Sequence, residues 1–245
     1  MAKLDCSRVL LKLSGELLKG GESAGVDSDA VSHVAARVRD FRALGVELAL
    51  VIGAGNIFRG LTASRRGMDR TCADYMGMLA TVINALALRE ALENQGVPTR
   101  IQSAIAMTGI IEPFDQVVAL DHLAAGRVLI FAAGTGHPFF TTDTTAALRA
   151  CQIGAKCLFK ATKVDGVYSA DPKVNRDATR YRQISYTDAL RQRLNVMDST
   201  AFSLCMDNGI PIVVFDFEEK DIFRRIVQGD LSRATLVSEG ETAVG

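Results

Sequence analysis

Four segments of the sequence combine glycines with cationic or hydroxyl side chains in a pattern that suits an anion. Lys12 stands in "KLSGE", Arg59 in "VIGAGNIFRG", Asp143 in "GTGHPFFTTDTTAALRA" and Lys160 in "LFKATKVDGVYSADP". A glycine lets backbone N–H groups approach a phosphate that a Cβ would keep away, and lysine or arginine neutralises its charge. No Ser-His-Asp set and no thiol–imidazole pair accompanies them. These residues favour phosphoryl transfer, in which a protein mainly positions and neutralises its reactants.

The segment Val51–Gly60 matches no standard nucleotide-binding pattern. The dinucleotide fingerprint requires a small residue where this chain has Phe58, and the ATP loop G-x-x-x-x-G-K-[ST] is absent. What remains is an apolar run that enters a glycine turn and delivers Arg59, whose planar guanidinium suits phosphate oxygens. A plain turn between a strand and a helix has the same pattern, so both interpretations stay open.

The run Thr135–Thr142 and the helix expected after it predict a second anion site. Two glycines make the loop flexible, and several threonine hydroxyls surround Asp143. A helix N-terminus adds oriented N–H groups and partial positive charge. An ordinary capped helix, with Thr142 or Asp143 as its cap, is the alternative. Because one cap would not require so many hydroxyls and glycines, we favour the anion site, and we assign His137 no catalytic role.

The loop after Lys160 suits both ends of a nucleotide. A phosphate chain attracts lysine, and a base needs a flat apolar partner beside polar groups, which Tyr168 and Asp171 could supply. A solvated loop with scattered charge is the alternative. Lys12 also has two interpretations, because a lysine inside an apolar run is either a solvated residue at an edge or a cation aimed into a site.

Short apolar runs alternate with amphipathic segments, and this alternation predicts the elements that position these residues. The expected strands are Arg8–Leu13, Glu47–Ile52, Thr99–Ser103, Val128–Ala132, Cys157–Lys160 and Ile212–Phe215. The expected helices are Ser28–Leu44, Asp69–Gln95, Gln116–Ala125, Thr142–Gly154, Thr187–Arg193, Ser199–Asn208 and Asp221–Gln228. The order predicts an α/β fold, a three-layer sandwich with a central, mostly parallel sheet whose ligands bind at the carboxyl ends of its strands. We expect one long irregular stretch, Ala161–Ser185, to be functional or mobile.

The composition is that of a globular protein. Lysine plus arginine and aspartate plus glutamate number 28 each, so there is no basic excess for nucleic acid or a membrane surface. The uninterrupted apolar runs are too short to span a membrane, and the first residues lack the features of a signal peptide, so we expect a cytoplasmic location. The five cysteines form no C-x-x-C pair, and we expect reduced, buried thiols without a metal role.

Five ordered motifs resemble those of the bacterial uridylate kinase family, within the amino acid kinase superfamily, across nearly the full chain. They are "KLSGE" (Lys12–Glu16), "VIGAGNIFRG" (Val51–Gly60), "DYMGMLATVINALAL" (Asp74–Leu88), "AGTGHPFFTTDTTAALRA" (Ala133–Ala150) and "KATKVDGVYSADP" (Lys160–Pro172). The resemblance implies transfer of the γ-phosphoryl group of ATP to UMP, with Mg2+ bridging the phosphates, in pyrimidine nucleotide biosynthesis. It also implies one domain over residues 1–245, with a UMP-binding lobe over 1–155 and an ATP-binding lobe over 156–245.

The resemblance assigns roles to individual residues. Lys12 and Lys160 would bind the transferring phosphoryl group, and Asp143 would hold both lysines in place. The ATP side would comprise Lys12, Leu13, Ser14, Gly15, Gly55, Arg59, Thr162, Tyr168 and Asp171. The UMP side would comprise Ala54, Arg59, Asp74, Thr135, Gly136, His137, Pro138, Phe139, Phe140, Thr141 and Thr142. Asp74 would accept hydrogen bonds from the ribose hydroxyls, and no general base is required because the UMP phosphate is already an anionic nucleophile.

Assembly and regulation follow from the same resemblance. Similar enzymes are hexamers, often activated by GTP and inhibited by UTP, so we expect a homohexamer and these two effectors. The corresponding regulatory surface would comprise Gly20, Gly21, Glu22, Ser23, Ala24, Gly25, Arg100 and Arg127. Apart from the resemblance, the expected helix Asp69–Gln95 is apolar on more than one face. Most of these residues suit a core helix, and the surplus would suit a subunit interface.

The chain departs from the family pattern at two positions. Ala54 replaces a usual glycine, and its methyl group either tightens the acceptor pocket or is harmless if its φ is negative. His137 replaces a frequent asparagine. Two rival functions stay open: another small-acid or nucleoside-monophosphate kinase on the same fold, and a nucleotide-binding storage or sensor protein without turnover. The presence of Lys12, Asp143 and Lys160 argues against the second rival.

Overall fold

A computed structural model describes residues 4–172, 174–175, 177–194 and 196–244. Its centre is one sheet with the strand order β11-β8-β10-β9-β6-β1-β2-β5-β3-β4, and β7 pairs with β8. The strands are β1 (Arg8–Leu13), β2 (Glu47–Ile52), β3 (Thr99–Ser103), β4 (Glu112–Pro113), β5 (Val128–Ala132), β6 (Cys157–Thr162), β7 (Val167–Tyr168), β8 (Arg180–Ser185), β9 (Ile212–Asp216), β10 (Ala234–Ser238) and β11 (Ala243–Val244). All neighbouring pairs from β9 across to β4 are parallel. The predicted α/β fold with a mostly parallel sheet is confirmed.

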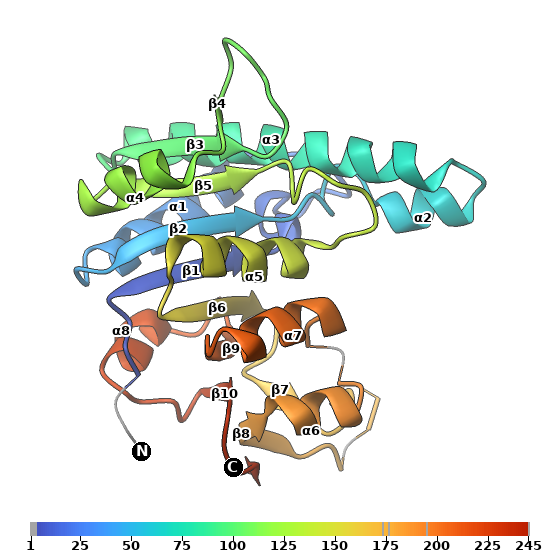
Figure 1. Cartoon of the computed structure of the whole chain (residues 1–245), viewed down its shortest axis with the longest axis vertical. Helices are drawn as coiled ribbons and strands as arrows, with labels where there is room; N and C mark the ends of the chain where they lie inside the picture. The colour runs from blue at the N-terminus through green and yellow to red at the C-terminus, as the bar shows by residue number, and fades with distance from the viewer. Residues whose placement is uncertain (1–3, 173, 176, 195, 245) are drawn as a thin grey trace.

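Helices cover both faces of this sheet (Figure 1). The helices are α1 (Ser28–Arg42), α2 (Gly60–Arg65), α3 (Arg70–Asn94), α4 (Gln116–Ala124), α5 (Thr142–Ile153), α6 (Tyr186–Arg191), α7 (Ser199–Asp207), α8 (Ile222–Val227) and a single 3-10 turn, η1 (Gly15–Leu18). Apolar residues of α1, α3 and α8 share one core with the sheet, and those of α4 to α7 share a second core on the opposite face. Leu11 of β1 belongs to the first core and Leu10 to the second, as the two-residue period of a strand requires. Both faces are therefore buried, which explains why these strands are nearly continuous in apolar residues.

The central strands and the helices agree closely with the sequence prediction. Of the predicted strands, β1, β2, β3 and β5 have the expected bounds, while β6 continues to Thr162 and β9 to Asp216. The seven predicted helices are present with ends that differ by one or two residues. The helix expected at Thr187–Arg193 begins at Tyr186 and ends at Arg191, and Arg193 adopts a left-handed φ of 51° that an α-helix cannot accommodate.

Several expectations need correction. The stretch Ala161–Ser185 is not irregular, because it contains the end of β6 and the strands β7 and β8; residues 173 and 176 of this stretch lie outside the described residues. The short elements η1, α2, β4, β10 and β11 were not predicted from the sequence. The cysteines are not all buried, since Cys72 is exposed and Cys151 is only half-buried.

Helix α3 is long and apolar enough, by length and composition alone, to cross a membrane. Part of that apolar surface is core, because Ala85, Leu88 and Leu92 are fully buried. The rest forms an exposed stripe at helical spacing that includes Leu79, 48% exposed, and Ile83, 52% exposed. We call Tyr75, Met76, Leu79 and Ile83 the α3 stripe. The predicted apolar surplus of this helix is thus present on its surface.

Candidate active site

Lys12 and Lys160 stand next to each other on two paired strands. In the parallel ladder between β1 and β6 they are direct partners. Asp143, in the first turn of α5, lies between their ammonium groups, with Oδ1 3.1 Å from Lys12 Nζ and Oδ2 2.6 Å from Lys160 Nζ. Lys160 also donates a hydrogen bond to the carbonyl oxygen of Val196. The three predicted catalytic residues therefore form one cluster near the carboxyl ends of β1 and β6.

This cluster is largely shielded from solvent. The exposed fractions of the side chains are 14% for Lys12, 16% for Asp143 and 11% for Lys160. Burial alone would raise the pKa of Asp143, but the adjacent lysines outweigh burial and hold that pKa below its ordinary value. Burial lowers the pKa of Lys160, and the attraction of Asp143 offsets only part of that effect. Two ammonium groups facing one carboxylate leave the cluster with an excess of positive charge.

Two glycine turns pack against each other beside the cluster. Gly15 follows β1 and Gly53 follows β2, and a Cβ on Gly15 would lie 2.4 Å from the carbonyl oxygen of Gly53. Only glycine fits there. Ser14 caps the turn η1, because its side chain accepts a hydrogen bond from the N–H of Glu16. The side chain of Leu13 is fully buried, so only the backbone of this predicted ATP-binding residue borders the turn.

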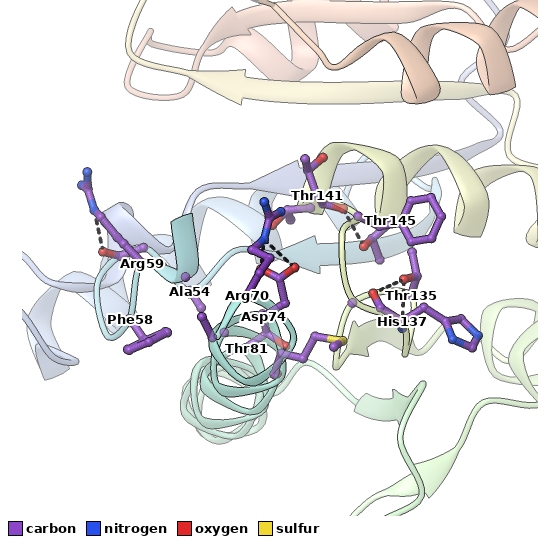
Figure 2. Close-up of a pocket in the computed structure, with 18 of the residues that line it drawn as sticks. Ala54, Phe58, Arg59, Arg70, Asp74, Thr81, Thr135, His137, Thr141 and Thr145 are labelled. Carbon is purple, nitrogen blue, oxygen red and sulfur yellow. Dashed lines mark hydrogen bonds and ion pairs between the residues drawn. The ribbon is translucent and has the colours of Figure 1, made fainter. Parts of the chain in front are cut away.

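A cavity of about 450 Å3 opens between α3, the turn after β2 and the loop before α5 (Figure 2). The predicted UMP-binding residues that line it are Ala54, Arg59, Asp74, Thr135, His137, Phe140, Thr141 and Thr142. We call it the acceptor cavity. Gly136, Pro138 and Phe139 belong to the same loop but not to the lining, while Gly55, predicted for ATP, does line it. The backbone of Ala54 lies outside the left-handed region, so its methyl group borders the cavity without strain.

Helix α5 begins at the wall of the acceptor cavity. Oγ1 of Thr141 accepts hydrogen bonds from the N–H groups of Asp143, at 3.0 Å, and Thr144, at 3.2 Å. The cap is therefore Thr141 and not Thr142 or Asp143, the two positions that the simple capping alternative expected. Because Thr142 in the first helical turn lines the cavity, the partial positive charge of this helix end is directed toward it. The observed cap is compatible with both interpretations, because a capped helix end still directs its partial positive charge toward the cavity.

Arg59 stands at the rim of the acceptor cavity with its guanidinium turned outward. Figure 2 shows its side chain extending away from Asp74 and Thr141. Its Nη2 lies 2.6 Å from Glu16 Oε1, and its side chain is 63% exposed. Burial would raise the pKa of Glu16, but the hydrogen bonds and positive charges of Arg59 and Lys19 together outweigh burial and lower that pKa. An exposed ion pair contributes about 0–1 kcal/mol, so a phosphate could replace Glu16 as the partner at small cost.

Two further cavities adjoin Lys160, and neither shares a lining residue with the acceptor cavity. One of about 240 Å3 is lined by Lys12, Ser14 and Thr162, and the other, of about 450 Å3, by Thr162, Tyr168 and Asp171. Lys160 and Thr162 line both of them. Most of the predicted ATP-side residues therefore border these two neighbouring cavities, whereas Gly55 and Arg59 border the acceptor cavity.

Tyr168 is fixed within the larger of these two cavities. Its hydroxyl donates to Asp165 Oδ1 at 2.6 Å, and this hydrogen bond raises the pKa of Tyr168. Arg180 lies 3.5 Å from the second oxygen of the same carboxylate. The ring is thus held in one orientation at the cavity wall, where it offers a flat apolar surface.

Asp198 joins the site although the sequence did not single it out. It caps α7, and its carboxylate accepts hydrogen bonds from the hydroxyls of Thr141 and Thr144. It therefore ties α7 to the start of α5 beside Asp143. The sequence signal was only an aspartate before Ser199, a pattern shared by any helix start.

Two buried asparagines also went unrecognised. Asn56 and Asn84 exchange side-chain hydrogen bonds of 2.9 and 2.8 Å, and Asn84 also donates to the carbonyl oxygen of Gly53 at 2.8 Å. One feature of the sequence indicated this role, because Asn84 is a polar residue within the apolar stretch of α3. The pair fixes the turn after β2 against α3, so the acceptor cavity keeps its shape on that side.

The predicted regulatory residues do not come together within one chain. The segment Gly20–Gly25 follows β1 and is bonded to the turn after β2, since Gly25 N–H donates to the carbonyl oxygen of Asn56 at 2.8 Å. Arg127 directly precedes β5, and Arg100 is the second residue of β3. Because β1, β2, β5 and β3 are parallel, these arginines lie near the amino ends of the strands, whereas Gly20–Gly25 lies beyond the carboxyl end of β1.

Comparison with known proteins gives the class that this fold and site define. Residues 7–216 match the model of the amino acid kinase family. The chain belongs to that family.

Solved structures narrow the similarity further. The chain is similar to the UMP kinase of Bacillus anthracis, with 37% identity, a TM-score of 0.93 and 98% of each chain covered. It is similar to the UMP kinase of Ureaplasma parvum, with 36% identity, a TM-score of 0.89, and 98% of this chain and 100% of that chain covered. Similarity to the uridylate kinase of Archaeoglobus fulgidus is lower, with 28% identity and a TM-score of 0.71 over 94% of this chain and 99% of that chain.

Proposed function

We propose that this protein is a UMP kinase, which transfers the γ-phosphoryl group of ATP to UMP and releases UDP and ADP. The observation that carries the proposal is the position of the Lys12–Asp143–Lys160 cluster between two kinds of cavity. Asp143 directly follows Thr142 of the acceptor cavity, and Lys160 lines both cavities on the other side. A phosphoryl group passing between two nucleotides would cross this cluster.

The chemistry needs cations and positioning more than covalent catalysis. An oxygen of the UMP phosphate forms a bond to the γ-phosphorus while the bond from that phosphorus to the β–γ bridging oxygen breaks. Charge spreads over the transferring oxygens, and fixed donors stabilise it without reorganisation. Lys12 and Lys160 would supply these donors, and Asp143 would keep their ammonium groups together despite their mutual repulsion. Removal of one such donor typically costs on the order of a hundredfold or more in rate.

Mg2+ would enter as part of the Mg·ATP substrate. Among the described residues, no three His, Cys, Asp or Glu side chains come together as a metal cage. The carboxylate nearest the reaction, Asp143, is already paired with two lysines. Mg2+ commonly binds substrate phosphates and keeps several waters, so this donor set suits a metal carried by ATP. We assign residues 1–155 to the UMP lobe and residues 156–245 to the ATP lobe, in one cytoplasmic domain.

The same proposal includes assembly into a homohexamer with the α3 stripe as one subunit interface. A contiguous exposed apolar surface on a core helix is typical of such contacts. Ile83→Lys would place a charge in the stripe, and Val174→Lys is a matched control because Val174 is 85% exposed. Light scattering should show a smaller particle for Ile83→Lys only. An unchanged mass for both variants would contradict an interface at this stripe.

Regulation by GTP as activator and UTP as inhibitor belongs to the proposal as well. An effector that contacted both Gly20–Gly25 and Arg127 would need two copies of the chain, because these groups lie at opposite ends of the parallel strands. Activity should therefore respond to GTP only in the assembled protein. A GTP response that persists in a monomeric Ile83→Lys variant would contradict this arrangement.

The test of the main proposal is ADP release from Mg·ATP with UMP, CMP, dUMP, AMP or GMP as acceptor. We expect selective turnover of UMP, and a loss of at least about a hundredfold in Lys12→Ala. Lys156→Ala is the matched control, because this lysine is exposed just before the amino end of β6. Faster turnover of another acceptor would overturn the substrate assignment. ATP binding without any turnover would favour a nucleotide-binding sensor.

A further inference from the structure

Arg70, Asp74 and Phe139 connect the start of α3 to the loop before α5 at one end of the acceptor cavity. Nε of Arg70 lies 2.8 and 3.0 Å from the two carboxylate oxygens of Asp74. The N–H of Phe139 donates to Asp74 Oδ2 at 2.8 Å, and the Arg70 guanidinium lies 5.3 Å from the centre of the Phe139 ring. Figure 2 shows Arg70 directly beside Asp74 at the cavity wall. We call these three residues the Arg70 clamp.

The stability of α3 does not account for Arg70. It is the first residue of the helix, where the helix dipole disfavours a cation by about 0.3–1 kcal/mol. A cation four residues before a carboxylate is also the weaker order for a pair on a helix. Arg70 is not needed to cap the helix either, because Asp69 already accepts a hydrogen bond from the N–H of Cys72. The position of Arg70 is therefore better explained by what it holds across the cavity.

Phe139 shows that the loop is held under strain. Its φ of 71° is in the left-handed region, which costs a residue other than glycine about 1–3 kcal/mol. The residue is 65% exposed, so burial in the core does not hold it there. What does hold it is the hydrogen bond to Asp74 and the contact with Arg70. Without these contacts we expect the backbone of Phe139 to relax toward an ordinary φ.

We infer that Arg70 is a positioning residue for the acceptor, which orients Asp74 toward the ribose and fixes the loop before α5. The inference rests on the proposed function and adds a residue to it. Asp74 is 14% exposed and lines the cavity, and a carboxylate has about four acceptor positions. Arg70 and Phe139 occupy only part of this capacity. Asp74 can therefore accept a hydrogen bond from a ribose hydroxyl while the clamp holds its orientation.

The experiment compares the KM for UMP, dUMP and ATP in the wild type, Arg70→Gln and Arg70→Lys. Arg70→Gln should raise the KM for UMP about tenfold and leave the KM for ATP within about twofold. It should also reduce the preference for UMP over dUMP, because a misplaced Asp74 no longer accepts a hydrogen bond from the ribose 2′-hydroxyl, which dUMP lacks. Arg70→Lys keeps the charge but not the planar fork, so it should recover part of the loss. Arg66→Gln is the matched control. It removes the same charge, and Arg66 is exposed at the end of α2.

A double-mutant cycle tests whether Arg70 acts through Asp74. In an Asp74→Asn background, Arg70→Gln should change the KM for UMP by less than about twofold. The inference is overturned if Arg70→Gln has its full effect in that background, if it raises the KM for UMP and dUMP equally, or if Arg66→Gln has the same effect. A wild type that does not phosphorylate UMP would instead refute the proposed function, so the two failures are distinguishable.

Discussion

Replacement of Asp143 by asparagine tests the cluster most sharply, because it keeps the size of the side chain and removes its charge. In the wild type, one carboxylate lies 3.1 Å from Lys12 Nζ and 2.6 Å from Lys160 Nζ. The asparagine leaves two ammonium groups close together with no anion between them. We expect both a loss of stability and a loss of turnover from this single change.

The magnitude follows from the burial of the three groups. Removing one partner of a buried ion pair costs about 3–5 kcal/mol, and the 16% exposure of Asp143 favours the lower end. For a chain of this size a loss of about 3 kcal/mol corresponds to a fall in Tm of about 6–12 °C. Thermal unfolding of both proteins at the same concentration measures this fall in Tm. Asp121→Asn, an exposed carboxylate on α4, is the matched control and should leave Tm unchanged.

The pH dependence gives the same test a second readout. The folded protein holds the pKa of Asp143 below its ordinary value of 3.8, since the lysines outweigh burial. A carboxyl group of this kind adds stability that is present above its unfolded pKa and is lost as pH falls through its folded pKa. The gap in stability between wild type and Asp143→Asn should therefore be full at neutral pH and shrink below pH 3.8. Equal stability at neutral pH, or a gap that does not change with pH, would refute the reasoning.

Three further variants give separate predictions. Asp74→Asn should raise the KM for UMP with that for ATP little changed, as steady-state kinetics with each substrate varied would show; the reverse pattern would move Asp74 to the ATP side. Arg59→Gln should raise the KM for UMP about tenfold or more, because a charged hydrogen bond to phosphate contributes about 1.5–3 kcal/mol, and an unchanged KM would contradict a phosphate role. Gly15→Ala should lower the free energy of unfolding by about 1–3 kcal/mol, measured by urea denaturation, since its Cβ would lie 2.4 Å from the carbonyl oxygen of Gly53; wild-type stability would mean that the two turns can move apart without cost.

The sequence predicted the central sheet because burial on both faces leaves a clear signal. Strands such as Val128–Ala132 are buried at every position, so their residues are continuously apolar. Strand β8, Arg180–Ser185, gave no such signal, because it carries two arginines and is only partly buried. Strands of two residues, such as β7, are too short to show any period. Strands that carry charge or are very short were therefore missed for lack of a local signal, whereas the missed β10 is largely buried and had one.

The candidate site was predicted to the extent that it depends on strand ends. Lys12 and Lys160 belong to neighbouring parallel strands, and the rule that ligands bind at carboxyl ends brings such residues together. Asp198 and the Asn56–Asn84 pair were missed, because their roles arise from partners 28 or more residues away that no local pattern specifies. The outward turn of Arg59 toward Glu16 likewise depends on a contact between two separate loops.

The central claim is that phosphoryl transfer occurs between two nucleotides across the Lys12–Asp143–Lys160 cluster. The most direct measurement follows the γ-phosphate of labelled Mg·ATP in the presence of UMP and separates the products. The account predicts that the label appears in UDP, in a one-to-one ratio with ADP, and that Lys12→Ala loses this transfer while remaining folded. Label recovered only as inorganic phosphate, or transfer that survives in folded Lys12→Ala, would contradict it.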